Sequence, residues 1–198
     1  MGIFDNNVHM NGAGTTYQSF LEPSRKAAVE IEASALGPAQ KKAFLAKVMA
    51  AKIDLAHVKM AIRTVTAFDG GALSGAVKAG DGAKLANEFF RFVATINSAI
   101  TAQDEKDAIY GSEDYTAFVT TSTDLLFTLN PEIADGVRNL DADAREKLFD
   151  AAGGAATAKS AEIQKLSEAG GNDNQALRME AKHWSSASSC IMQLRQGA

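Results

Sequence analysis

The sequence predicts an all-α protein, an elongated helical bundle of five to seven helices. Two long segments, residues 38–68 and 174–196, carry apolar residues at alternating spacings of four and three. That spacing places one apolar stripe along a helix and keeps the stripe facing a partner helix. Glycine clusters and prolines stand between the helical segments, where they end one helix or begin the next.

The composition indicates one domain preceded by an arm. The chain has 198 residues, of which 46% are hydrophobic and 22% charged, which is enough for a single core. Residues 1–19 are polar and rich in glycine and asparagine, so they predict a flexible N-terminal arm. Residues 20–198 predict a single helical domain with glycine-rich connections near 69–83 and 151–156.

The first helices include the most regular part of the chain. Ser24 is placed to cap a helix over 25–36, which Gly37 and Pro38 would end. The helix over 38–68 follows, and its heptad stripe consists of Phe44, Val48, Ala51, Leu55, Val58, Ile62 and Val65. Because a repeat of 3.5 residues is typical of coiled-coil pairs, we expect this helix to pair with the C-terminal helix.

The middle of the chain predicts two helices after the glycine-rich connection. One runs from about residue 85 to 110, and Phe89, Phe90 and Phe92 lie on or beside its apolar stripe, as core aromatic residues do. The other spans 113–129 and contains four consecutive hydroxyl-bearing residues, 120–123. Such residues weaken a helix because their hydroxyls compete for backbone hydrogen bonds, so a strand stays an alternative here.

The C-terminal third predicts short helices followed by a long one. Asn130 and Pro131 begin a short helix, and Asp141 is placed to cap the next, which would end at residues 153–154. A helix over 157–169 precedes a break at 170–174. The last helix, 174–196, carries the second heptad, Leu177, Ala181, Trp184, Ser188 and Ile191. The small residues around Trp184 would let a neighbouring helix come close.

Charge and hydropathy bear on partners and location. The formal net charge is -4 and no basic block occurs, so nucleic acid is not expected as the main partner. No stretch reaches the roughly 18 uncharged apolar residues of a membrane span. The N-terminus shows no cleaved signal peptide, so we expect a cytoplasmic protein or one exported or assembled by a route that needs no such signal.

The residues that carry catalytic or metal chemistry are few. The single cysteine, Cys190, has no thiol partner for a disulfide or a zinc site. The histidines, His9, His57 and His183, are too scattered for zinc. Glu180 and His183 form one ExxH motif, whereas a di-iron bundle needs two such motifs and further glutamates. We therefore expect no enzyme, no catalytic residue, no cofactor and no metal.

Three features near the C-terminus point to a family. They are IQKLS at 163–167, Trp184 twenty-one residues after Ile163, and SSCIMQ at 188–193. Together they resemble the end of the EspA/SseB family of type III secretion translocator filament proteins. The resemblance implies a protein that polymerises through paired long helices near its two ends into a hollow extracellular conduit. No functional residue is carried over from the family.

The leading functional hypothesis is a non-enzymatic, self-assembling structural subunit, a component of a secretion filament or a virion. Heptad seams also occur at oligomer interfaces, so the partner would be a second copy or another protein. The candidate interface residues are Phe44, Val48, Leu55, Val58, Ile62, Val65, Leu177, Trp184 and Ile191. The alternative is a monomeric adaptor or effector that binds a partner through a groove between helices. A helical-bundle enzyme or metal carrier built on Glu180 and His183 is the third hypothesis.

Overall fold

The computed structural model describes residues 26–51, 55–99, 112–169 and 174–197. Across these ranges it contains nine helices and no strand, which confirms the all-α class and exceeds the predicted five to seven helices. A first helical segment, 26–33, precedes α2 (Pro38–Ala51), α3 (Leu55–Ala67), α4 (Gly71–Ala79), α5 (Gly82–Ala99), α7 (Ser112–Leu129), α8 (Pro131–Arg138), α9 (Ala142–Ala169) and α10 (Gln175–Gly197). The predicted arm, 1–19, lies outside the described residues.

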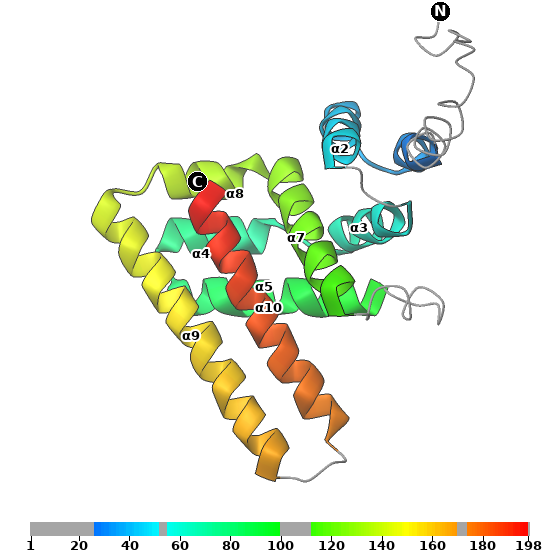
Figure 1. Cartoon of the computed structure of the whole chain (residues 1–198). Coiled ribbons are helices and arrows are strands. Elements are labelled where there is room, and N and C mark those ends of the chain that lie inside the picture. The colour runs from blue at the N-terminus through cyan, green and yellow to red at the C-terminus, as the bar shows by residue number, and fades with distance from the viewer. Residues whose placement is uncertain (1–25, 52–54, 100–111, 170–173, 198) are drawn as a thin grey trace, which may run out of the picture.

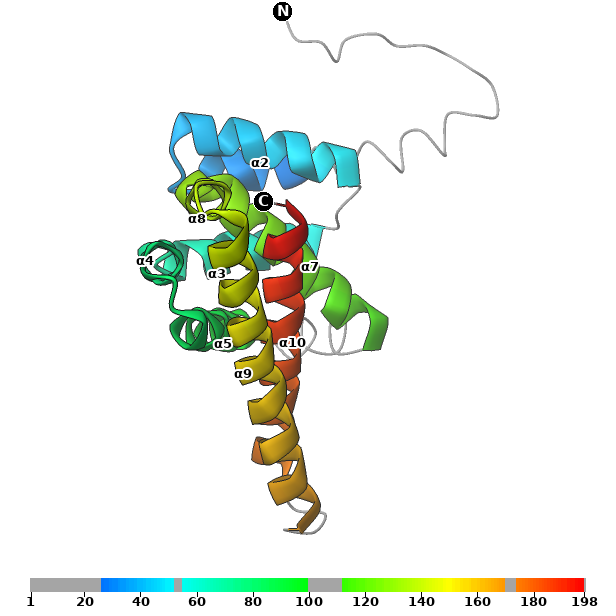
Figure 2. The same ribbon diagram turned by 90° about the vertical axis from the view of Figure 1, so that its left-hand side faces the viewer.

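The helices are arranged around α5. Helices α9 and α10 form an antiparallel hairpin across one side of the molecule, and α4 and α5 run crosswise to it (Figure 1). Helix α7 lies beside α5 and α10, and α3 packs against α5 and α7. Helix α2 packs mainly on α7, at the end of the molecule where α8 also lies (Figure 2).

Helix α5 has a strongly amphipathic sequence, which explains its central place. The side chains that it buries completely or almost so are Leu85, Ala86, Phe89, Phe92, Val93 and Ile96. Their spacing of three and four residues puts them on one face of the helix. Helices α3, α4, α7, α9 and α10 all pack against α5.

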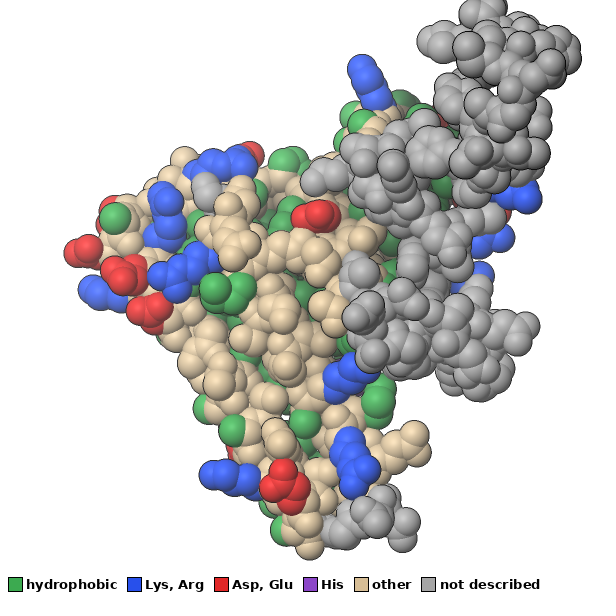
Figure 3. All heavy atoms as spheres, in the orientation of Figure 1, with side chains coloured by type: hydrophobic (Ala, Val, Ile, Leu, Met, Phe, Trp, Pro, Cys, Tyr) green, Lys and Arg blue, Asp and Glu red, His purple; other side chains and the backbone are tan. Residues whose placement is uncertain are grey.

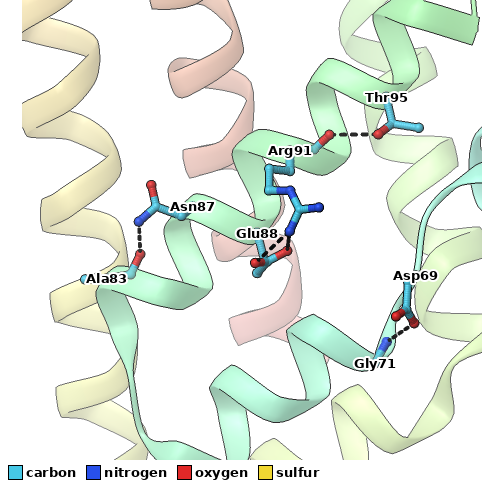
Figure 4. A network of polar contacts seen from close by, with 7 residues as sticks. All are labelled: Asp69, Gly71, Ala83, Asn87, Glu88, Arg91 and Thr95. Atoms are coloured by element: carbon cyan, nitrogen blue, oxygen red, sulfur yellow. Dashed lines mark hydrogen bonds and ion pairs between the residues drawn. The ribbon is translucent and has the colours of Figure 1, made fainter.

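The outward side of α5 is polar and is held by short-range bonds (Figure 4). Asn87 Nδ2 donates to the carbonyl of Ala83 at 3.0 Å, and Thr95 Oγ1 donates to that of Arg91 at 2.9 Å. Arg91 Nη1 lies 3.0 Å from Glu88 Oε2. Glu88 is only 8% exposed, so this guanidinium neutralises a carboxylate that is largely removed from water.

The glycine-rich segment 69–83, predicted as a connection, instead contains helix α4. Leu73, Ala76 and Val77 are buried there, because α4 packs against both α5 and α8. That burial outweighs the low helix propensity of the glycines. The connection itself is short: Gly80 adopts φ 63°, and its N–H and that of Asp81 bond the carbonyls of Val77 and Ala76.

Residues 151–156, predicted as a second glycine-rich connection, lie inside α9. The helices predicted on either side of them therefore form one helix of 28 residues. Ala152 and Ala156 are buried within this stretch, against α5 and α10. Tertiary packing thus carries the helix through Gly153 and Gly154, which by themselves would favour an end.

The predicted heptad helix over 38–68 is two helices, α2 and α3, and its expected pairing with the C-terminal helix is not found. The main neighbours of α2 and α3 are α7 and α5, whereas α10 packs on α9, α5 and α7. Phe44 and Val58 are nevertheless fully buried. The heptad identified the buried side of these helices correctly, but it holds no information about which helix covers that side.

Helix α7 settles the ambiguity over 113–129 in favour of a helix. Within its hydroxyl-rich run, Thr123 Oγ1 donates to the carbonyl of Val119 at 2.7 Å, and near the end of the helix Thr128 Oγ1 donates to that of Asp124 at 2.7 Å. These are bonds to the residue four positions earlier, which leave the helical backbone intact. The strand alternative was therefore wrong.

The predicted caps of α8 and α9 differ in outcome. Asp141 caps α9 as expected, because its Oδ1 accepts the backbone N–H of Ala144 at 2.8 Å. Pro131 begins α8, but Asn130 makes no side-chain cap bond. Its Nδ2 donates to the carbonyl of Leu126 at 2.9 Å instead, so the asparagine stabilises the end of α7.

The first residue of α5, Gly82, lies in direct contact with α9. A Cβ atom at this position would stand 2.6 Å from Ala151 Cβ and 2.7 Å from the carbonyl oxygen of Leu148. The second of these is a backbone atom, which cannot rotate away. The crossing of α5 over α9 therefore requires glycine here.

We predict that Gly82→Ala lowers the free energy of unfolding by about 1–3 kcal/mol, because the two helices must separate. Gly153→Ala is the matched control, since a Cβ there meets nothing within 4 Å. It should raise the free energy by about 0.5–1 kcal/mol through helix propensity. Urea unfolding followed by circular dichroism measures both. Equal effects of the two substitutions would refute the close contact.

Candidate functional site

The C-terminal hairpin, α9 and α10, projects from the described part of the molecule. Its two helices continue well past α5, away from α8, in both views (Figures 1 and 2). We call residues 157–169 of α9 and 174–181 of α10 the distal hairpin. The rest of the hairpin packs on the body, and the contacts at the border between the two parts hold the projection in place.

An aromatic stack anchors α10 to α5 at this border. The rings of Phe90 and Trp184 are stacked with centroids 4.3 Å apart and an interplanar angle of 26°. Trp184, the only tryptophan of the chain, is 7% exposed. Phe90 is partly buried, so the stacked pair removes apolar ring surface from water where α10 crosses α5.

A polar contact lies one residue away from the stack. His183 Nε2 of α10 lies 2.8 Å from Asn97 Nδ2 of α5. Asn97 Nδ2 also donates to Tyr115 Oη of α7 at 3.1 Å. The Lys182 ammonium stands over the Tyr115 ring, 4.1 Å from its centroid. Three helices therefore meet through one asparagine. The imidazole nitrogen that faces the amide N–H of Asn97 must accept a hydrogen bond from it.

Polar bonds join the second half of α10 to α7. Gln193 Nε2 donates to Asp124 Oδ1 at 2.6 Å and to the carbonyl of Thr120 at 3.0 Å. Cys190 Sγ lies 3.2 Å from Thr123 Oγ1. The Thr123 hydroxyl already donates its proton to Val119, so it accepts from the thiol, and Cys190 is the donor.

The position of Cys190 makes it a packing residue. Its side chain is completely buried, and burial raises the pKa of the thiol to about 12, although the Thr123 bond opposes the rise. At neutral pH the sulfur is therefore protonated, and a protonated thiol is neither a nucleophile nor a metal ligand.

The distal hairpin is covered on one side only. Of the described residues 157–169, Ser167 alone is buried, and Ser160 and Ile163 are partly buried. Together with Ala156 they form the seam toward α10, where Ser160 Oγ donates to the carbonyl of Ala181 at 3.1 Å. Leu166 lies off this seam and is 51% exposed. A seam of small residues removes little apolar surface from water, so this part of the hairpin gains little from its own packing.

The nine predicted interface residues lie mostly in the chain's own core. Phe44, Val58, Val65, Trp184 and Ile191 are buried, and Ile62 and Leu177 are partly buried. The side chains of Val48 and Leu55 lie outside the described part of the chain. An interface role for the buried positions stays a prediction, because they already contact neighbouring helices of the same chain.

Sequence reasoning missed the residues that the fold exposes. Leu166 carried a signal, because it falls outside the 4-3-4 spacing of Ala156, Ser160, Ile163 and Ser167. Helix periodicity places an apolar side chain outside that spacing on the water-exposed side of the helix. Ser160, Ile163 and Ser167 fall within the predicted helix 157–169, but which side of it is covered depends on its pairing with α10, which no local pattern contains.

The face of the molecule that carries α10 has an uneven charge distribution. Charged side chains gather at the α8–α9 corner and toward the free end of the hairpin, while the surface over the middle of α10 is largely uncharged (Figure 3). A shallow open groove lies there between α7 and α10, lined by Thr120, Ser188, Ser189, Met192, Gln193 and Gln196. Met192 is 48% exposed at this groove.

The described residues contain no group of three or more His, Cys, Asp or Glu side chains that could hold a metal ion. His183, the histidine of the ExxH motif, directs Nε2 at Asn97, and burial lowers its pKa more than Glu180 raises it. None of the described helices is long and apolar enough to cross a membrane.

Comparisons of the chain with models of protein families, with curated proteins and with solved structures found no match. The function therefore has to be inferred from the sequence and from the contacts of the chain itself. Those contacts single out the C-terminal hairpin.

We predict that Cys190 is unreactive in the folded protein. Its burial and its raised pKa both suppress the thiolate, so Ellman's reagent at pH 8 should label less than a tenth of the chains in the time that it labels all of them in 6 M guanidinium chloride. Rapid labelling of the native protein would show that α10 does not stay packed on α7.

We predict that Phe90→Ala lowers the free energy of unfolding by about 2 kcal/mol and shifts the fluorescence of Trp184 to longer wavelength, because the indole loses its cover. Phe127→Ala is the matched control: Phe127 is another partly buried ring, in edge contact with Phe89 at 6.2 Å. It should cost similar stability without the spectral shift. A shift in both variants would contradict a local effect.

Proposed function

We propose that the chain is a non-enzymatic structural subunit that self-assembles, and that the distal hairpin provides a contact with a second copy. The observation that carries this proposal is the projection of two helices beyond the body, with the exposed Leu166 on their outer side. A packed neighbour would remove from water the apolar surface that the hairpin leaves exposed.

The charges of the outer surface fit a contact between identical copies. Lys159 and Lys165 alternate along α9 with Glu162 and Glu168. Lys159 Nζ already lies 2.8 Å from Glu162 Oε2 on the same helix. Because the two signs are present in equal number, two copies of this segment can face each other without net repulsion.

Further support comes from the chemistry of the side chains that an enzyme would use. The one thiol is protonated and buried, and His183 is committed to a contact between helices. The resemblance of 163–167, Trp184 and 188–193 to filament-forming translocator proteins agrees with an assembly role. Microscopy of the purified chain distinguishes a filament from a ring or a part of a larger particle.

We predict that the purified chain forms ordered particles larger than a 20.9 kDa monomer as its concentration rises. Negative-stain microscopy and light scattering after gel filtration measure this directly. Leu166→Glu should lower the assembled fraction at least tenfold at the wild-type midpoint concentration, because it places a charge in the contact.

The matched control for this prediction is Val29→Glu, which changes a still more exposed aliphatic residue, 67% exposed, in the first helical segment. It should leave assembly unchanged. Circular dichroism of both variants confirms that the fold is retained. A chain that stays monomeric at every accessible concentration would rule out self-assembly, and equal effects of the two substitutions would place the contact elsewhere.

The second candidate function is a monomeric adaptor that binds a partner protein. The groove between α7 and α10 favours it, because Met192 stands exposed among small polar side chains, as an adaptable contact would. A 1:1 complex with a partner, lost in Met192→Glu and kept in Leu166→Glu, would support the adaptor over the assembly subunit.

A further inference from the structure

The contact between His183 and Asn97 depends on which of their nitrogen atoms carry hydrogen. Asn97 Nδ2 has two hydrogens and lies within bonding distance of Val93 O at 2.9 Å, of Tyr115 Oη at 3.1 Å and of His183 Nε2 at 2.8 Å. The Val93 carbonyl can only accept, so it takes one hydrogen. The other hydrogen points toward the tyrosine and the histidine, and His183 Nε2 accepts it only when that nitrogen carries no proton.

Protonation of the imidazole therefore places two hydrogen-bond donors, His183 Nε2–H and Asn97 Nδ2–H, opposite each other. Nε2–H would face the amide N–H of Asn97, whose nitrogen has no lone pair to offer. Rotating the amide would bring its oxygen to the imidazolium, but the same oxygen would then face the carbonyl oxygen of Val93. The present orientation sets two donors against each other in acid, and the rotated one restores a bond to His183 only by giving up the bond to the Val93 carbonyl.

We propose that the Asn97–His183 contact is an acid-sensitive latch that holds the C-terminal hairpin on α5 while the imidazole is neutral and loosens when the imidazole gains a proton. The contact joins residues 86 positions apart, and it lies where the distal hairpin leaves the body. Loss of this contact would free the projecting part of α10 from α5 before it affected the packing of the core. The inference concerns the hairpin alone and stands whether or not the hairpin mediates assembly.

The surroundings of His183 set the direction of the response. From α5 it faces Asn97 and the ring of Phe90, 5.9 Å away, and neither titrates. Tyr115 of α7 meets it through Asn97. Among the described charged groups, Glu180 favours the imidazolium and Lys182 opposes it, and from α9 Lys159 acts on Glu180.

The sign of the pH dependence follows from the lowered pKa. Burial is the largest cause, and it holds the pKa of His183 below its ordinary value of 6.5. Between the folded and unfolded pKa values the unfolded chain binds more protons, so stability rises with pH there. The contribution of the latch is complete above the unfolded value and is lost as the pH falls below it.

The test compares thermal unfolding of the full chain at pH 7.5 and 5.5. Wild type should lose melting temperature of the order of 3 °C more than His183→Gln, because glutamine accepts from Asn97 and does not titrate. His57→Gln, which removes another histidine, should behave as wild type. Equal losses in wild type and His183→Gln would overturn the proposal.

A second variant favours the protonated imidazole instead of the neutral one. Asn97→Asp offers a carboxylate that pairs with the imidazolium and raises its pKa, so this chain should lose less melting temperature in acid than His183→Gln does. A loss as large as that of wild type would overturn the proposal. Where Asn97→Asp does not fold, the comparison of wild type with His183→Gln decides alone.

Hydrogen exchange separates the latch from a general loss of stability. At pH 5.5, after correction for the intrinsic rate, amides of the first half of α10 should exchange at least threefold faster in wild type than in His183→Gln. Amides of α4 should exchange equally in the two chains. Faster exchange throughout the molecule, or none in α10, would count against a latch at the hairpin.

Discussion

The buried face of α5 is the constraint on which the rest of the structure depends. This helix packs against α3, α4, α7, α9 and α10, so each of them is positioned by its contact with the same helix. Phe89 and Phe92 fill the centre of that row without any exposed surface. The need to cover it explains why sequences with low helix propensity, such as α4 and the middle of α9, are helical all the same.

The same helix divides the C-terminal hairpin into an anchored part and a projecting part. Where α9 and α10 cross α5, they meet it through Gly82 and Trp184, and both contacts are close. Beyond the crossing, each of the two helices has the other as its main neighbour within the described part of the chain, and the seam between them consists largely of small side chains. An element built in this way keeps its helical form through its continuity with the anchored half, while its outer side stays available for a partner.

The sequence predicts the fold class and the buried sides of the helices well, and their partners poorly. Phe44, Val58 and Ile191 are recognisable as buried because periodicity follows from helix geometry alone. Their neighbours depend on the three-dimensional path of the chain, which no local pattern contains. The pairing of the two heptads was wrong for this reason, and so were the connections at 69–83 and 151–156, where distant contacts override glycine.

The candidate site was harder to predict than the fold. Asn97 and Tyr115 belong to no motif, and the sequence presents His183 only as a candidate for metal or catalytic chemistry. Their importance comes from three helices meeting at one point, which depends on residues far apart in the chain. Leu166, by contrast, lies within the predicted helix 157–169, and the pairing of α9 with α10 was enough to recognise it as an apolar residue off the seam.

The wide separation between α5 and α10 also bears on how the protein reaches its fold. Asn97 bonds a partner 86 residues further along the chain, and the separation between Phe90 and Trp184 is longer still. Closing so large a loop costs chain entropy before the contact can stabilise the fold, so we expect this step late in folding. During synthesis Phe90 emerges well before α10 does, and its ring lacks the cover of Trp184 until the last helix is made.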